Sequence, residues 1–271
     1  VKIRFSETVY NFWNGSGALD TDDFTLSISG GSATLGSTNP TAITKDTPTF
    51  SSATIDGNLN GAQGLQIADL DFDGDKDIIA CGKNGDDINW YENDGSGNYT
   101  ERSIDGNLNG AQGIAVNDID GDGDFDIFAT ARDGDQVALY TNNGSQSFTK
   151  TVIDSDLIEP HHVECTDLND DGHMDLIATG RVSDKIIWYS NDGSQNFTEN
   201  VLRDDLNGAI TFFISDVDED GDKDIIVAEL DGNKVAFLSN DGSESFTNTT
   251  IASVNRVRAV SAADVDGDGD I

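Results

Sequence analysis

The sequence predicts an all-β protein built from repeated four-stranded units, and three observations lead to this fold class. First, the 271 residues include 29 glycines and many Asp, Asn, Ser and Thr, a composition typical of short strands joined by tight turns. Second, apolar and polar residues alternate in short segments, which is the period of a β-strand. Third, an acidic motif recurs at a nearly constant spacing, which indicates one structural unit copied along the chain.

The copies of the acidic motif define the repeat. They begin at Asp69, Asp118, Asp167, Asp216 and Asp264, so successive copies are 49, 49, 49 and 48 residues apart. The segment IDGNLNGAQG stands before both the first and the second copy, and weaker versions precede the later ones. The chain therefore holds about four complete repeats and partial ones.

Each repeat contains four short strands. In the first strand, apolar and polar residues alternate up to the acidic motif, with apolar residues at Leu65 and Ile67. The second strand is the apolar run IIAC from Ile78, which is too short for a helix. The third carries INWY from Ile88 and ends at the turn sequence NDGS, and the fourth begins at Tyr99. Such units must bury their apolar faces against neighbouring copies. A β-propeller with four-stranded blades fits this unit, whereas leucine-rich and hexapeptide solenoids have shorter repeats.

Composition excludes several functions. The 51 acidic residues against 15 Lys and Arg give a formal net charge of -36, so we expect no nucleic-acid partner, because phosphate binding needs a basic surface. No stretch approaches the length of apolar sequence that a membrane helix needs, so we expect no direct membrane insertion. The start VKIRFSETVY has no signal-peptide pattern and no Met, which favours a mature product or a fragment.

The acidic motif predicts a metal-binding loop between the first and second strands. Its copies fit D-x-[DN]-x-D-G-x-x-D, and carboxylates packed at these positions would repel one another without a cation. Glycine at the sixth position allows a sharp turn, so that the backbone carbonyl of the seventh residue can also point inward. The predicted metal-site residues are Asp69, Asp71, Asp73, Asp75 and Asp77; Asp118, Asp120, Asp122, Asp124 and Asp126; Asp167, Asn169, Asp171, His173 and Asp175; Asp216, Asp218, Asp220, Asp222 and Asp224; and Asp264, Asp266, Asp268 and Asp270.

Calcium is the ion that this pattern favours. Ligands that are all oxygen favour Ca²⁺ over Zn²⁺, and their number and the flexible loop favour it over Mg²⁺. An EF-hand would need a Glu at the twelfth position and flanking helices, but Ala80 stands there and the flanks are predicted strands. We expect one Ca²⁺ per loop, in four complete loops and one truncated loop.

The third repeat departs from the others. Asn169 replaces an acid and His173 occupies the seventh position, so fewer formal charges predict the lowest calcium affinity there. His161 and His162 replace the Gln-Gly of the GAQG segment, near Glu159. A structural variant of the turn is favoured over a zinc site, which would need a third convergent ligand.

Two further sets of strand residues are interpreted as core. Trp90, Trp188 and Phe237 occupy equivalent positions, which favours packing between blades over an aromatic platform for sugar rings. Cys81 and Cys165 fall at different positions of non-adjacent repeats, which favours buried free thiols over a disulfide or a redox pair.

At these residues the chain resembles the FG-GAP/VCBS repeat family, the calcium-loop propellers of integrin α-subunit heads and of many secreted bacterial proteins. The resemblance covers residues 50–271 and rests on the acidic loop, on NGAQG before it, and on WYENDG or WYSNDG behind it. It implies a propeller, often of seven blades, whose metal sites support the blades. It also implies that Asp69, Asp71, Asp73 and Asp77, with their equivalents, are calcium ligands.

The repeats and the first 49 residues are expected to form separate regions. Residues 50–271 would be part of a larger ring, since about four repeats do not close one. Residues 1–49 are expected to be a partial β segment. It either resembles part of a bacterial immunoglobulin-like domain, as in DFTLSISGGSATL, or contributes strands to the propeller, as FWNGSGALDTDDFT suggests.

The leading functional hypothesis is a non-catalytic, calcium-binding propeller, secreted or on the cell surface, that serves adhesion or recognises a glycan or protein. The extracellular location follows from the calcium concentration that such modules need. The alternative is an accessory or catalytic propeller of a secreted polysaccharide-degrading enzyme, a lyase or hydrolase. No nucleophile and base pair accompanies the repeats, which favours the binding module, and a structural spacer in a surface protein is a third hypothesis.

Overall fold

The computed structural model describes residues 53–264. The strands described below belong to one compact unit that begins at Thr54. The interpretations of residues 1–49, immunoglobulin-like or propeller strands, lie outside the described residues, as do Asp266, Asp268 and Asp270 of the truncated loop. Residues 53–264 contain no helical segment that could span a bilayer.

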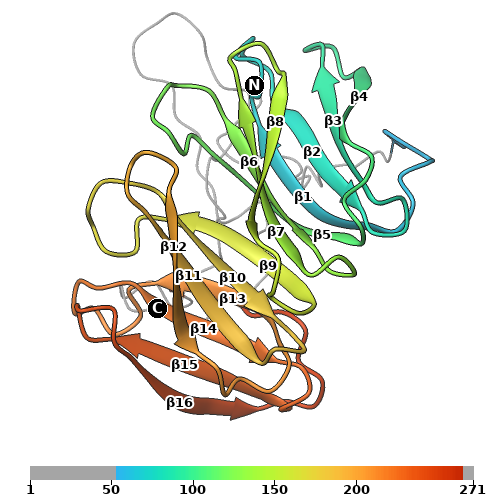
Figure 1. The fold of residues 1–271 in the computed structure, drawn as a ribbon. Coiled ribbons are helices and arrows are strands. Elements are labelled where there is room, and N and C mark those ends of the chain that lie inside the picture. The colour runs from blue at the N-terminus through green and yellow to red at the C-terminus, as the bar shows by residue number, and fades with distance from the viewer. Residues whose placement is uncertain (1–52, 265–271) are drawn as a thin grey trace, which may run out of the picture. The chain divides into compact units, whose positions relative to one another are not determined.

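The described residues form four antiparallel sheets of four strands each, with the strands of every sheet in chain order (Figure 1). We call the sheets blades 1 to 4. Blade 1 contains β1 (Ala62–Ala68), β2 (Asp77–Gly82), β3 (Asp87–Asn93) and β4 (Tyr99–Asp105), and blade 2 contains β5 (Ala111–Asn117), β6 (Asp126–Ala131), β7 (Gln136–Asn142) and β8 (Phe148–Asp154). Blade 3 contains β9 (Pro160–Thr166), β10 (Asp175–Gly180), β11 (Lys185–Asn191) and β12 (Phe197–Arg203), and blade 4 contains β13 (Ala209–Ser215), β14 (Asp224–Glu229), β15 (Lys234–Asn240) and β16 (Phe246–Ser253). The predicted all-β architecture of four-stranded propeller blades is confirmed.

Burial follows the strand order within a blade. The first strands of neighbouring blades contact one another, β1 with β5, β5 with β9 and β9 with β13. Every residue of the second strands β6, β10 and β14 is buried, whereas the fourth strands β4, β8 and β12 are largely exposed. The first strands are therefore the inner strands of the propeller, and the fourth strands form its outer rim.

The core lies between the blades. One hydrophobic cluster joins Leu70, Ile79 and Trp90 of blade 1 to Ile114 and Tyr140 of blade 2, and similar clusters join blade 2 to blade 3 and blade 3 to blade 4. Each fully buried aliphatic side chain of this kind contributes about 1.5–3 kcal/mol. The blades therefore stabilise one another through the faces of their sheets.

Equivalent residues differ in exposure according to their neighbours. Leu65 of blade 1 is 55% exposed, whereas Ile114 at the same position of blade 2 is 4% exposed because blade 1 covers it. Trp90 and Trp188 are 4% and 8% exposed, so they pack between blades as predicted. Cys81 is buried and, like Cys165, forms no disulfide.

Blade 1 is joined to blade 2, and blade 2 to blade 3, by a tyrosine and an aspartate as well, a contact that the sequence analysis missed. The Tyr140 hydroxyl, on the third strand of blade 2, donates to Asp105 Oδ2 at the end of the fourth strand of blade 1, over 2.6 Å. Although burial opposes ionisation, the hydrogen bonds from Tyr140 and Lys150 hold the pKa of the Asp105 carboxyl below its usual value. The same pairing joins Tyr91 to Asp56 and Tyr189 to Asp154. In all three pairs, tyrosine follows aspartate by 35 residues.

We expect Tyr140→Phe to lower the free energy of unfolding by about 1.5–3 kcal/mol, because it removes a hydrogen bond to a half-buried carboxylate. Urea unfolding followed by tryptophan fluorescence measures this change. Tyr99→Phe is the matched control, since the Tyr99 hydroxyl makes no hydrogen bond with any described residue. Equal stability of the Tyr140→Phe and Tyr99→Phe proteins would contradict a role for this pairing.

Candidate metal centres

The acidic loops connect the first and second strands of each blade. Glycine at the sixth position has a left-handed backbone, with φ of 99° at Gly74 and 97° at Gly123. A Cβ at either glycine would meet no atom within 4 Å, so the backbone angle, and not a lack of space, is the reason for glycine.

The fourth position is left-handed as well, which the sequence analysis missed. Phe72 has φ of 58° and Asp170 has φ of 55°, although such angles are unfavourable for residues with a side chain. The Phe72 ring stacks on Phe125 of the next loop, with ring centroids 5.4 Å apart. In the first loop, this contact with the neighbouring loop supports the conformation of Phe72.

The ninth aspartate anchors each loop to its blade. Asp77 is fully buried, and its carboxylate accepts hydrogen bonds from the Leu70 backbone N–H (3.0 Å) and the Asn93 backbone N–H (2.8 Å). Leu70 lies within the loop and Asn93 ends the third strand, so one carboxylate ties the two together. Asp126, Asp175 and Asp224 make the same two contacts in blades 2 to 4.

The first, third and fifth side chains fold back over the loop. Asp69 Oδ2 accepts from the Gly74 N–H (3.1 Å), Asp71 Oδ1 from the Asp73 N–H (3.3 Å), and Asp73 Oδ1 from the Asp75 N–H (2.9 Å). The second, third and fourth blades repeat the contact between the first side chain and the sixth N–H. These bonds turn the carboxylates toward one region of space.

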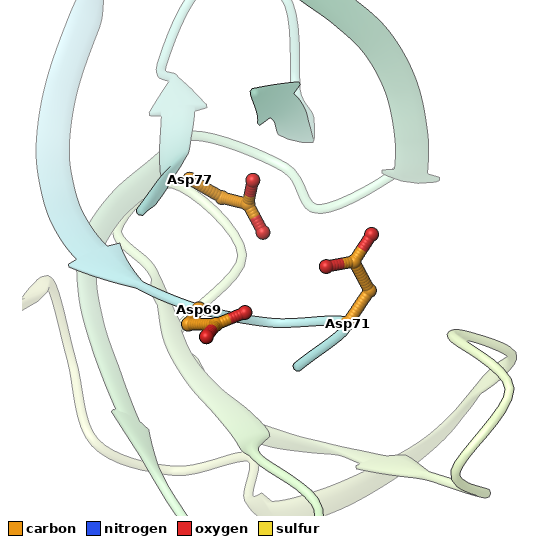
Figure 2. A group of neighbouring side chains, drawn as sticks. All are labelled: Asp69, Asp71 and Asp77. Carbon is orange, nitrogen blue, oxygen red and sulfur yellow. The ribbon is translucent and has the colours of Figure 1, made fainter. Parts of the chain in front are cut away.

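Three of the four complete loops bring carboxylate oxygens within 4.8 Å of one another. Figure 2 shows Asp69, Asp71 and Asp77 of the first loop, with the Asp71 and Asp77 carboxylates facing each other. The other groups are Asp118, Asp120 and Asp122 in the second loop, and Asp216, Asp218 and Asp224 in the fourth. The third loop has no such group among the described residues, and its predicted low affinity stays a prediction.

The side chain at the seventh position turns away from these groups. In blade 1, a Cβ on Gly95 would overlap the carboxylate of Asp75, so the side chain lies against the turn between β3 and β4. Asp124, His173 and Asp222 lie in the same way against Gly144, Gly193 and Gly242. The seventh residue is therefore left with its backbone carbonyl as the group that could bind a metal, as the sequence suggested.

The oxygen groups fit a hard divalent cation. Asp69 Oδ1 is buried and has no hydrogen-bond partner among the described residues, which is costly for a carboxylate unless a positive charge is near. Burial, together with the charges of Asp73 and Asp77, raises the pKa of the Asp71 carboxyl, and burial raises that of Asp126 to about 6. Because the donors are all oxygens, calcium suits them better than softer metals.

His161 and His162 do not join a metal group among the described residues. The His162 Nδ1 atom accepts a hydrogen bond from the Phe212 backbone N–H (3.3 Å), and the two rings lie 4.6 Å apart. His162 Nε2 is 3.6 Å from a carboxylate oxygen of Glu164. The contacts with Phe212 join blade 3 to blade 4, and they support the structural interpretation at His162.

We expect Asp126→Asn to lower the free energy of unfolding in EDTA by about 1–3 kcal/mol, because the amide cannot accept both backbone N–H groups. Asp122→Asn is the control. Asp122 is exposed, and its contact with the Asp124 N–H needs one oxygen, which asparagine retains. Equal urea midpoints in EDTA for the two variants would show that the ninth position is not an anchor.

The family model described as FG-GAP-like repeat matches residues 69–129, 118–178, 167–227 and 216–271, each match running from one acidic loop through the next. None of the curated proteins compared with the chain matches it.

Solved structures share the fold at low sequence identity. The nidogen/laminin complex matches with a TM-score of 0.55 and 14% identity over 76% of this chain and 70% of that chain. An auxiliary nutrient binding protein from Bacteroides ovatus matches with a TM-score of 0.51 and 15% identity over 70% of this chain and 46% of that one. A lectin from Agrocybe aegerita that recognises non-reducing terminal N-acetylglucosamine matches with a TM-score of 0.50 and 20% identity, over 70% and 52%. The chain thus spans about half the length of the last two proteins. Its repeats, its blades and the family match together place it in one family: the chain belongs to the FG-GAP-like repeat proteins and forms β-propeller blades.

Proposed function

We propose that this chain is a calcium-binding propeller module that recognises an extracellular glycan or protein and is not itself catalytic. The observation that carries the proposal is the convergence of carboxylate oxygens within 4.8 Å in three loops that share one backbone design. The buried Asp69 Oδ1, which has no partner among the described residues, supports a cation there in particular.

Calcium would act through the stability of the blades. The first, third, fifth and ninth side chains and the seventh backbone carbonyl would hold it, and the ion would neutralise carboxylates that otherwise repel one another. Because each loop joins the inner strand of a blade to its buried second strand, a bound ion would fix the connection between them. Because calcium would bind the folded chain and not the unfolded chain, it would raise the free energy of unfolding by mass action.

Two arguments support recognition outside the cell. Modules of this kind bind calcium at about 10⁻⁴ to 10⁻³ M, a concentration found outside the cell and not in the cytosol. The structures of similar fold include an N-acetylglucosamine-specific lectin, a nutrient-binding protein and a complex of nidogen with laminin, and each of these is a case of binding. The likeness is one of fold, so the glycan or protein ligand of this chain is part of the proposal.

We expect EDTA to lower the melting temperature of the chain, and millimolar CaCl₂ to restore it. At a free calcium concentration about 100 times Kd, each site adds about 2.7 kcal/mol to the free energy of unfolding. Magnesium should restore less of the melting temperature than calcium, because magnesium prefers to keep its own water ligands. Zinc should restore the least, because the loops offer only oxygen ligands. Differential scanning calorimetry measures all four conditions on the same preparation.

A melting temperature that does not change with EDTA and calcium would refute the metal part of the proposal. Recognition is tested separately, with the calcium-loaded chain on glycan and extracellular-matrix protein arrays. Turnover in a panel of polysaccharide lyase and hydrolase substrates would favour the alternative, an enzyme of that class, over a binding module.

A further inference from the structure

The third loop is short of one negative charge within its own sequence. Asn169 stands at the third position, where the first and second loops have Asp71 and Asp120. Its side chain turns inside the loop, since Asn169 Nδ2 donates to Asp171 Oδ2 over 3.0 Å. If the loop holds calcium as its neighbours are proposed to do, a further carboxylate would bring its charge to theirs.

A neighbouring blade reaches the third position of the second loop. Gln195 lies in the turn between β11 and β12 of blade 3, and its Nε2 donates to Asp120 Oδ2 of blade 2 over 2.8 Å. The Gln195 Oε1 accepts from the Thr141 hydroxyl, also of blade 2, over 3.2 Å. The turn of one blade thus contacts the acidic loop of the blade before it.

The residue equivalent to Gln195 in blade 4 is Glu244, one 49-residue repeat later. Gln195 and Glu244 share a left-handed backbone, with φ of 60° and 55°, and both are half-buried between exposed neighbours. The same backbone angle at equivalent points of a repeated hairpin directs the two side chains alike. Glu244 therefore occupies in blade 4 the position from which Gln195 of blade 3 reaches the second loop.

The packing beneath the two turns is also the same. Ile119 of the second loop shares a hydrophobic cluster with Phe197, two residues after Gln195. Leu168 of the third loop shares a cluster with Phe246, two residues after Glu244. A salt bridge of 2.9 Å between Lys223 of blade 4 and Asp170 further joins blade 4 to the third loop.

The third position of each of the first three loops and the equivalent turn position of the next blade together carry one acidic and one amide side chain. Where the loop has aspartate, the facing turn has glutamine, and where the loop has asparagine, the facing turn has glutamate. The pairs are Asp71 with Gln146, Asp120 with Gln195, and Asn169 with Glu244. The Glu244 carboxylate forms no hydrogen bond or ion pair with any described residue.

We propose that Glu244 of blade 4 supplies the missing carboxylate to the metal site of the third loop, so that this site is built from two blades. The inference rests on the proposed calcium function. The donors would be Asp167, Asn169, Asp171 and Asp175 from the loop and Glu244 from the next hairpin. The site would then match its neighbours in charge, and its calcium would hold blade 3 to blade 4.

Calcium titration of the full chain tests this proposal. After removal of metal with a chelator, isothermal titration calorimetry measures the number of ions bound and their affinities. We expect Glu244→Gln to weaken one site at least about tenfold and to leave the others unchanged. The double variant Asn169→Asp with Glu244→Gln copies the arrangement of Asp120 and Gln195, and we expect it to recover the lost affinity.

Two controls make the result specific to the third loop. Glu199→Gln removes the same charge from an exposed position of β12, and we expect no effect on any site. In an Asp171→Asn background, in which the third loop is already weakened, Glu244→Gln should change the remaining affinities no further.

The outcomes separate this proposal from the proposed function. If the wild-type chain binds calcium and Glu244→Gln leaves every affinity within about twofold, Glu244 is not a ligand and the calcium function stands. The proposal would also be overturned if Glu244→Gln still weakened one calcium site about tenfold in the Asp171→Asn background, because the affected site would then lie outside the third loop. If the wild-type chain binds no calcium, both proposals fail.

Discussion

Each blade depends on one buried carboxylate. The ninth aspartate of the acidic loop, such as Asp77, is fully buried and accepts backbone N–H groups from the loop and from the end of the third strand. A buried charge is costly unless it is fully hydrogen-bonded or paired. The loop must therefore close over this carboxylate in one way, which sets the direction of the other acidic side chains.

The same anchor connects the acidic loops to the hydrophobic core. Leu70, whose N–H donates to Asp77, is fully buried in the cluster between blades 1 and 2. Its neighbours in the sequence, Asp69 and Asp71, belong to the carboxylate group. Because these residues are adjacent, a change that moves the carboxylates also moves an apolar residue at the blade interface. Metal binding and blade packing are expected to be energetically coupled for this reason.

The interfaces between blades hold polar contacts that a single blade lacks. Tyr140 and Asp105 join the outer parts of blades 1 and 2, whereas Gln195 joins the turn of blade 3 to the loop of blade 2. Blade 4 departs from the repeat at both kinds of position, with Leu238 in place of tyrosine and Glu244 in place of glutamine. A repeat protein can vary such residues one interface at a time, because each blade contacts only its neighbours.

The sequence by itself determined the period, the four strands of each blade, the place of the acidic loops and the glycine at their sixth position. These features are local, and each can be recognised from a few adjacent residues and confirmed by its recurrence. Only the tertiary structure decided that the ninth aspartate is a buried anchor, that the fourth position is left-handed at Phe72, and that Gln195 reaches Asp120. The physical reason is that these features depend on contacts between residues that are distant in the chain. Asp77 accepts from Asn93, 16 residues later, Phe72 stacks on Phe125 of the next loop, and Gln195 and Asp120 are 75 residues apart.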